Sequence, residues 1–364
     1  MRTVILYLLM VCLVQATAGF VFEDLPSVKE LIREYGYDQD LTLEELKEFS
    51  EKKKSLKLAN KVEEYAEYIP NSRPIIAILT QPRTESPPYN SYIMAAYAKF
   101  VFQAGGRVIP LHWDNSLENI TDTLKSVNGV IITGGDQVIQ DPISLIFSDY
   151  TNRVKFVLDQ AKEINDEGSY FPVWAICQGF EQLSIIEGPE YGRLSHATAK
   201  NIPRKLEFVR DENGEIIRGR IYKEMSDDLT KALEAKEIAF HNNEFRLDPF
   251  AYKYDVGLKA YNVLAYSRDR DGRPMVASIE HKDYPIYSNQ WHPEKNSFVW
   301  KETIPVPHSK LALQLTQYMS DFFVTECRKN THKYGTPEEE RSAIIENHPV
   351  EVTDGSAADI YLFY

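Results

Sequence analysis

Cysteine is scarce in this sequence: 3 of the 364 residues are Cys, at positions 12, 177 and 327, and none belongs to a C-x-x-C pair. This scarcity excludes a disulfide scaffold and argues against a zinc knuckle. An apolar core must therefore hold the chain together, and 43% hydrophobic residues are enough for one large or two medium domains.

Positive charge is also in short supply. The chain has 41 Lys+Arg against 54 Asp+Glu, a formal net charge of -13, and its sequence contains no segregated basic face. Such a chain repels a phosphate backbone, so we expect no nucleic-acid partner.

Long apolar runs are missing except at the start. Arg2 precedes the apolar run 4–14, and Ala16 to Ala18 supply the small residues that signal peptidase accepts. We expect cleavage after Ala18, which places the protein in the secretory pathway, either in a lysosomal or vacuolar lumen or outside the cell. The alternative is an uncleaved, buried N-terminal helix. The run is too short for a stable membrane anchor.

Asn119 begins the single Asn-x-Ser/Thr sequon and is either glycosylated or part of a bare surface turn.

The chain divides into four segments that differ in composition and sequence pattern. Residues 1–18 form the signal peptide. Residues 19–72 form a helical N-terminal extension, in which a capping box starts a charged helix that is either a solvated surface helix or a removable pro-segment. Residues 73–330 are expected to form the main globular domain. Residues 331–364 form an acidic tail, which we expect to be loose apart from an apolar end that can dock on the domain.

Short apolar runs alternate with helical patterns through the first half of the segment 73–330. The expected strands are 75–79, 108–111, 130–133 and 172–176, and the expected helices include 91–104 and 150–164. This alternation predicts an α/β fold: a doubly wound, mostly parallel sheet with helices on both faces. Further strands follow, and then a closing helix over 308–328; those strands are expected at 207–210, 216–222, 238–241, 263–266, 275–280 and 286–290.

Cys177 directly follows the apolar strand 172–176, and a helical pattern begins soon after it. A nucleophile on a sharp strand-to-helix turn needs small neighbours, and Gly179 is one. The N-terminus of a helix also lowers the pKa of a thiol. Cys327, on the closing helix, is expected to be a buried bystander.

Gly134 and Gly135 end the strand 130–133, where backbone N–H groups can approach a substrate. The N–H groups of Gly135 and Gln178 can together stabilise an oxyanion. A phosphate cradle is the competing interpretation, but neither G-x-x-x-x-G-K nor G-x-G-x-x-G is present.

His292 and Glu294 follow the strand 286–290 and flank Pro293. A cysteine nucleophile needs a base, and the base needs a group that orients it. Ends of parallel strands meet at one edge of a sheet, so these two side chains are expected to lie near Cys177.

The stretches 171–181 (FPVWAICQGFE) and 290–295 (QWHPEK) resemble the nucleophile and histidine motifs of the gamma-glutamyl hydrolase family, part of the class I glutamine amidotransferase-like superfamily. The resemblance extends over residues 73–330. It implies hydrolysis of γ-linked peptide bonds in folylpoly-γ-glutamates through a thioester, without a metal or organic cofactor. In that reaction Cys177 is the nucleophile, His292 the general base and acid, and Glu294 the orienter. The residues that the resemblance places in the substrate site are Glu181, His241 and Gln290.

The residues themselves leave alternatives open. Glu181 can be a carboxylate that favours a helix start, and His241 a satisfied core histidine. Ala175 and Gln178 stand where the family has glycine and leucine. The rival functions are a glutaminase-type amidohydrolase and an inactive secreted binding protein, and a homodimer is left open. A polyanionic substrate requires cations, for which the candidates are Arg83, Arg204, Arg246 and Lys295.

Overall fold

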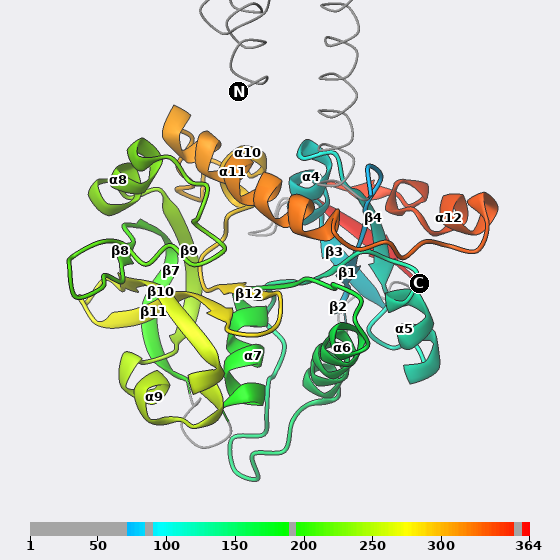
Figure 1. The fold of residues 1–364 in the computed structure, drawn as a ribbon, viewed down its shortest axis with the longest axis horizontal. Helices are drawn as coiled ribbons and strands as arrows, with labels where there is room; N and C mark the ends of the chain where they lie inside the picture. Colours follow the sequence, from blue (N-terminus) through cyan, green and yellow to red (C-terminus); the bar gives the residue numbers. More distant parts are fainter. Residues whose placement is uncertain (1–70, 84–89, 189–193, 353–358) are drawn as a thin grey trace, which may run out of the picture. The chain divides into compact units, whose positions relative to one another are not determined.

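The computed structural model describes residues 71–83, 90–188, 194–352 and 359–364 (Figure 1). The predicted signal peptide and nearly all of the predicted helical extension lie outside these residues. Within them, the largest sheet has eight strands, in the order β4 (Arg107–Leu111), β1 (Ile75–Leu79), β5 (Val130–Ile132), β6 (Val173–Ile176), β12 (Ile286–Asn289), β11 (Pro274–His281), β10 (Tyr261–Arg268) and β8 (Glu207–Phe208).

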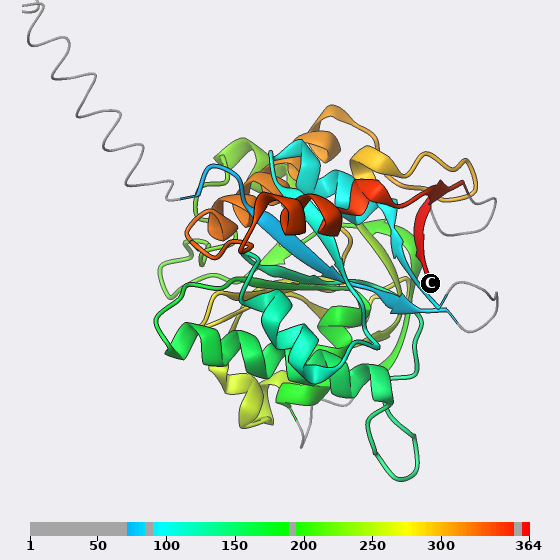
Figure 2. The same ribbon diagram turned by 90° about the vertical axis from the view of Figure 1, so that its right-hand side faces the viewer.

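The strands from β4 to β12 pair in parallel, whereas β11, β10 and β8 pair antiparallel. Parallel strands need helical crossovers, and the helices lie on both faces of the sheet (Figure 2). The predicted doubly wound, mostly parallel α/β sheet is thus confirmed.

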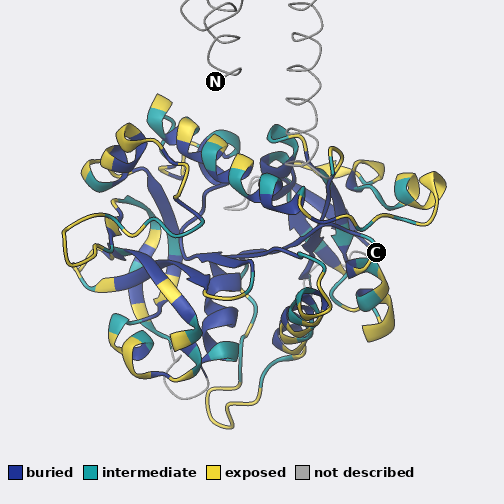
Figure 3. Ribbon diagram, in the orientation of Figure 1, coloured by how far each residue is buried: buried dark blue, intermediate teal, exposed yellow. Residues whose placement is uncertain are grey.

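Two helical layers bury the two faces of this sheet. The first layer contains α4 (Ala95–Gln103) and α11 (Lys310–Cys327), and the second contains α5 (Leu117–Leu124), α6 (Asp149–Asp166) and α7 (Gln178–Glu187). Successive side chains of a strand point to opposite faces. In β1, Ile76 and Ile78 therefore join the core with α4 and α11, while Ile75, Ala77 and Leu79 join the core with α5, α6 and α7. The central strands are consequently buried throughout (Figure 3).

No helix among the described residues combines the length and the apolar character needed to cross a membrane.

A separate antiparallel pair joins β7 (Ser195–Arg204) to β9 (Ala239–Arg246). The sequence predicted the start of β9 but not β7, whose charged and polar residues break the apolar pattern. The strand expected at 216–222 is wrong: Ile216 makes only an isolated bridge to Arg210, and turns follow.

The segment interpreted as a loose acidic tail is instead packed on the domain over its described residues. It contains α12 (Pro337–Ala343), β13 (Val350–Glu351) and β14 (Ile360–Phe363), and Glu340 pairs with Arg107. The predicted docking of its apolar end is confirmed: β14 pairs antiparallel with β3 (Ser91–Met94), which pairs in turn with β2 (Gln81–Pro82). The helix expected from residue 91 therefore begins at Ala95, because the first four residues are a strand held by the tail.

Candidate active site

Cys177 lies on the sharp turn between β6 and α7, as predicted. Its backbone has φ 55° and ψ -109°, a region that costs a residue with a side chain about 1–3 kcal/mol. The turn closes because Gly179 has no side chain: a β-carbon there would stand 2.5 Å from the carbonyl oxygen of Ile132. Ala175, in place of the family's glycine, is accommodated inside β6.

His292 and Glu294 form a buried pair after β12. The Nδ1–H of His292 donates to Oε1 of Glu294 at 2.7 Å, and the backbone N–H of His292 donates to the carbonyl of Phe240 at 2.8 Å. A carboxylate on Nδ1 fixes the tautomer that leaves Nε2 able to accept a proton. This Nε2 is buried and has no hydrogen-bond partner among the described residues.

Gly134 lies where the thiol and the imidazole meet. A β-carbon built on Gly134 would stand 3.1 Å from Cβ of Cys177 and 3.1 Å from Cε1 of His292. The N–H of Gly134 donates to the hydroxyl oxygen of Tyr97 at 2.8 Å, which fixes this loop against α4. Cys177 and His292 therefore border the same small space, as the sequence predicted.

Burial disfavours the charged forms of both side chains. Loss of solvent raises the pKa of the Cys177 thiol, and Glu181, when it is ionised, raises it further, against the opposing effect of Lys295. Loss of solvent also lowers the pKa of His292, as does Lys295. The prediction of a lowered thiol pKa is wrong for the free protein, because desolvation outweighs the helix terminus. The thiol instead contacts the carbonyl of Asn242 at 3.8 Å.

The two N–H groups considered as oxyanion donors make no backbone hydrogen bond within the described part of the chain. Neither the N–H of Gly135 nor that of Gln178 donates to a backbone carbonyl of the described residues. The Gln178 side chain clamps the loop after Gly135: its Nε2 donates to the carbonyl of Gln137 at 2.7 Å, and its Oε1 accepts from the N–H of Gln137 at 3.1 Å. Gln178, which stands where leucine is expected in the family, thus positions the loop that carries Gly135.

Glu181, Gln290 and His241 lie beside the catalytic pair. Oε1 of Glu181 accepts from Nε2 of Gln290 at 3.0 Å, and burial raises the pKa of Glu181 to about 8. Burial lowers the pKa of His241 to about 3, and its Nδ1 lies 3.3 Å from Oδ1 of Asn243. Nε2 of His241 and Oε1 of Gln290 are buried without a hydrogen-bond partner among the described residues.

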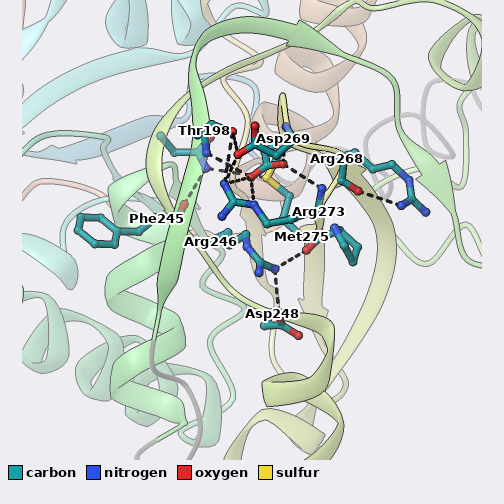
Figure 4. Close-up of polar contacts among 12 residues, drawn as sticks. Thr198, Phe245, Arg246, Asp248, Arg268, Asp269, Arg273 and Met275 are labelled. Carbon is teal, nitrogen blue, oxygen red and sulfur yellow. Dashed lines mark hydrogen bonds and ion pairs between the residues drawn. The ribbon is translucent and has the colours of Figure 1, made fainter.

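Two of the four candidate cations are already paired. Arg204 binds Glu237 at 3.0 Å. Arg246 binds Asp248 at 2.8 Å, as Figure 4 shows, at the end of β9 far along the strand from His241. Figure 4 also shows the neighbouring pair of Asp269 and Arg273, which closes the turn between β10 and β11.

The other sequence candidates lie away from this centre. Asn119 is exposed in the first turn of α5. Cys327 is fully buried in α11 and free, as expected of a bystander. No group of three His, Cys, Asp or Glu side chains within the described ranges is arranged to hold a metal ion.

Tyr97 and Gln137 were missed, since nothing in their local sequence marks them and only the fold brings them to the site.

Comparison with known proteins finds one family that matches this chain. The family model of peptidase C26 matches residues 74–294. Gamma-glutamyl hydrolase B of Dictyostelium discoideum is 32% identical over 80% of this chain and 84% of its own length. The gamma-glutamyl hydrolase of Glycine max is 33% identical over 80% of this chain and 85% of its own. The human gamma-glutamyl hydrolase is 31% identical over 75% of this chain and 83% of its own.

Among solved structures, PurLQS from Thermotoga maritima aligns with a TM-score of 0.39 and 14% identity, covering 67% of this chain and 97% of that one. The fold class rests on the strand order rather than on this distant likeness. The family match spans the strands that carry Cys177, His292 and Glu294, and it covers more than half of the sequence. The chain therefore belongs to the peptidase C26 family.

Proposed function

We propose that the protein hydrolyses γ-glutamyl bonds in folylpoly-γ-glutamates, with Cys177 as nucleophile. The observation that carries this proposal is the approach of Cys177 and His292 to one point beside Gly134. The gamma-glutamyl hydrolases among its relatives support the choice of bond. No step needs a metal or an organic cofactor.

The reaction begins from the neutral pair. Nε2 of His292 takes the thiol proton as Sγ of Cys177 attacks the γ-carbonyl carbon, and the oxyanion forms between the N–H groups of Gly135 and Gln178. The C–N bond then breaks, and the imidazolium gives its proton to the leaving amine. This leaves a γ-glutamyl thioester on Cys177.

Water completes the cycle at the same groups. Nε2 of His292 removes a proton from the water that attacks the thioester, and the second oxyanion occupies the same two N–H groups. The C–S bond breaks, and the thiolate recovers its proton from the imidazolium. Glu294 holds the imidazole ring throughout, because its bond to Nδ1 remains in both protonation states.

Glu181, His241 and Gln290 bind the substrate in this proposal. With its pKa raised to about 8, Glu181 holds its proton at neutral and acidic pH and can donate a hydrogen bond to a substrate carboxylate. The unpartnered atoms of His241 and Gln290 supply one further polar contact each. Glu181 thus offers an anionic substrate a neutral donor, whereas the unpartnered atoms of His241 and Gln290 can accept a hydrogen bond from a substrate N–H.

An inactive binding protein and a glutaminase are less well supported. A binding protein has no need of a nucleophile on a strained turn, or of a base held by a buried carboxylate. A glutaminase that feeds a synthetase needs a partner with access to ATP. A secretory signal would separate the two.

The proposed location is the secretory pathway, on the strength of residues 1–18. Asn119 is exposed on α5 and is proposed to carry a glycan. The test is Asn119→Gln in secreted protein: the variant should migrate faster than the wild type and be insensitive to glycosidase.

Product analysis on a defined γ-linked pentaglutamate tests the reaction class, the linkage and the cleavage position together. Release of shorter glutamate chains or free glutamate is the expected result, with an α-linked pentaglutamate left intact as the control. Cleavage of the α-linked chain alone, or of neither chain, would refute the proposed function.

A further inference from the structure

The short strand β2 contacts the loop 133–137, which carries the N–H of Gly135, at three positions. The side chain of Gln81 is buried, and its Nε2 donates to Oγ1 of Thr133 at 3.2 Å. A β-carbon on Gly135 would stand 2.5 Å from Oε1 and 2.6 Å from Cδ of Gln81, so the amide group packs directly against this glycine. The carbonyl of Pro82 accepts from Nε2 of Gln137 at 3.2 Å. The place of the loop therefore depends on the place of β2.

The pairing that holds β2 in turn depends on the C-terminal strand. β2 is the edge of a four-stranded sheet with the order β13, β14, β3, β2. Its two residues pair with Ser91 and Tyr92 of β3, and all four residues of β3 pair with β14 on the other side. A pair of strands alone is at best marginally stable in water. β14 supplies the third strand that secures the other two.

β14 also fixes the start of α4, which contacts the same loop. The N–H of Ala95 donates to the carbonyl of Asp359, directly before β14, at 2.7 Å. Two residues further along α4, the hydroxyl oxygen of Tyr97 accepts from the N–H of Gly134 at 2.8 Å. The end of the chain therefore supports the loop through α4 as well as through β2.

β14 is itself firmly docked on the domain. All four of its side chains are buried, and Tyr361 and Phe363 belong to the core that contains α4 and α11. The rings of His112 and His348 lie 5.3 Å and 4.8 Å from the ring of Phe363. Burial of these apolar side chains stabilises the docked strand. β14 thus gives β3 and β2 a fixed neighbour.

An oxyanion donor must point at its target before the reaction begins, because a small misplacement costs much of its effect. The N–H of Gly135 donates to no backbone carbonyl of the described residues, so its direction depends on the contacts that hold the loop. Gln178 holds this loop at Gln137, and Gln81 holds it at Thr133 and Gly135.

We infer that Gln81, held in place by the C-terminal strand β14, is a positioning residue for the oxyanion donor at Gly135. The inference rests on the proposed function, in which this N–H stabilises the oxyanion. It gives the C-terminal segment a part in catalysis although none of its residues touches the substrate.

The test combines one change at each end of this path. Gln81→Met keeps a similar side-chain volume but removes the hydrogen-bond donor. Leu362→Pro disrupts the pairing of β14, because proline has no N–H and a fixed φ. We would measure kcat and KM on a γ-linked glutamyl peptide for both variants and for the double variant.

Two matched controls change the same residue types elsewhere. Gln103→Met removes a hydrogen bond between α4 and the carbonyl of Thr316, away from the loop. Val352→Pro puts a proline into the same C-terminal segment at an exposed position outside β13 and β14.

Alkylation by iodoacetamide supplies a second measurement. The reaction at Cys177 depends on the thiol and its surroundings but forms no oxyanion, so it separates a displaced donor from general damage to the site. Cys327 is fully buried, and its labelling therefore reports unfolding.

Gln81→Met and Leu362→Pro should each lower kcat about 10-fold, less than the loss of a whole oxyanion donor, with KM nearly constant. The rate of Cys177 alkylation should not change, and both controls should keep the wild-type kcat. The double variant should lose no more than Leu362→Pro alone, because the two changes act on one path of contacts.

A wild-type kcat in Gln81→Met would overturn the inference, as would losses that multiply in the double variant or an alkylation rate that falls together with kcat. If labelling of Cys327 shows that Leu362→Pro unfolds, Gln81→Met alone decides. A wild type that cleaves no γ-linked peptide would instead refute the proposed function, which keeps the two failures distinct.

Discussion

Cys177 and His292 come from strands far apart in the sequence, yet Cβ of one and Cε1 of the other each lie 3.1 Å from the point that a β-carbon on Gly134 would occupy. A methyl group at this point would press on both side chains. The approach of Cys177 and His292 to each other therefore depends on a third residue, Gly134.

Gly134→Ala should separate the pair. The added methyl group would contact both side chains and the Tyr97 hydroxyl, so kcat should fall about 100-fold while KM changes little. Steady-state kinetics on a γ-glutamyl peptide measure this. The control is Gly335→Ala, whose methyl group would meet only the end of the flexible Glu339 side chain. Wild-type kcat in Gly134→Ala would show that the pair does not need this approach.

Glu294→Gln should cost about 1,000-fold in kcat, because an amide does not hold the His292 tautomer that leaves Nε2 free. The substitution should also shift the pH dependence of the remaining activity. Burial places the pKa of His292 below its usual 6.5, and Glu294 opposes that shift. Removing the carboxylate lowers the pKa further, so the acid limb of kcat/KM should move to lower pH. Movement to higher pH would contradict this assignment, and exposed Glu118→Gln is the control.

Gln178→Leu restores the family's residue but removes both hydrogen bonds to Gln137. The loop that carries the Gly135 N–H then loses its clamp. We expect kcat to fall about 10-fold, less than the loss of a whole oxyanion donor, with KM nearly constant. The pH midpoints should not move, since neither Cys177 nor His292 changes. An unchanged kcat would mean that other contacts hold the loop.

Glu181→Gln should make the protein more stable than the wild type as the pH rises. The pKa of Glu181 is raised from 4.5 to about 8 in the folded state, so the folded protein keeps a proton that the unfolded chain loses. The contribution of Glu181 to stability is full below about pH 4.5 and is lost progressively up to about pH 8. In urea unfolding, the free energy of unfolding of the variant should therefore rise relative to that of the wild type over this interval, by on the order of 3 kcal/mol. A constant difference between pH 4.5 and pH 8 would contradict the burial of this carboxyl group.

Local sequence was sufficient where one strand and the turn after it define a feature. The apolar run before Cys177 and the small residue Gly179 predict β6 and its turn, because burial and chain reversal are local requirements. By the same reasoning, His292 and Glu294 could be placed at the edge of the sheet. These predictions needed the order of strands but no particular partner.

Features that depend on a distant partner could not be predicted. The sequence of β3 predicts the start of a helix. The segment is a strand because β14, from the far end of the chain, pairs with it. β7 is too polar to be recognised as a strand without β9. The thiol pKa was predicted from the helix terminus alone, whereas burial by the whole fold decides its direction. The clamp of Gln178 on Gln137 likewise exists only once two loops meet.

The kinetics of Cys177→Ala, His292→Ala and the double variant on one γ-glutamyl peptide test the central claim most directly. If thiol and imidazole work as one unit, each single variant should lose at least about 10,000-fold in kcat/KM, and the double variant should lose no more than either. A single variant that cleaves at the wild-type rate, or losses that multiply in the double variant, would contradict the account.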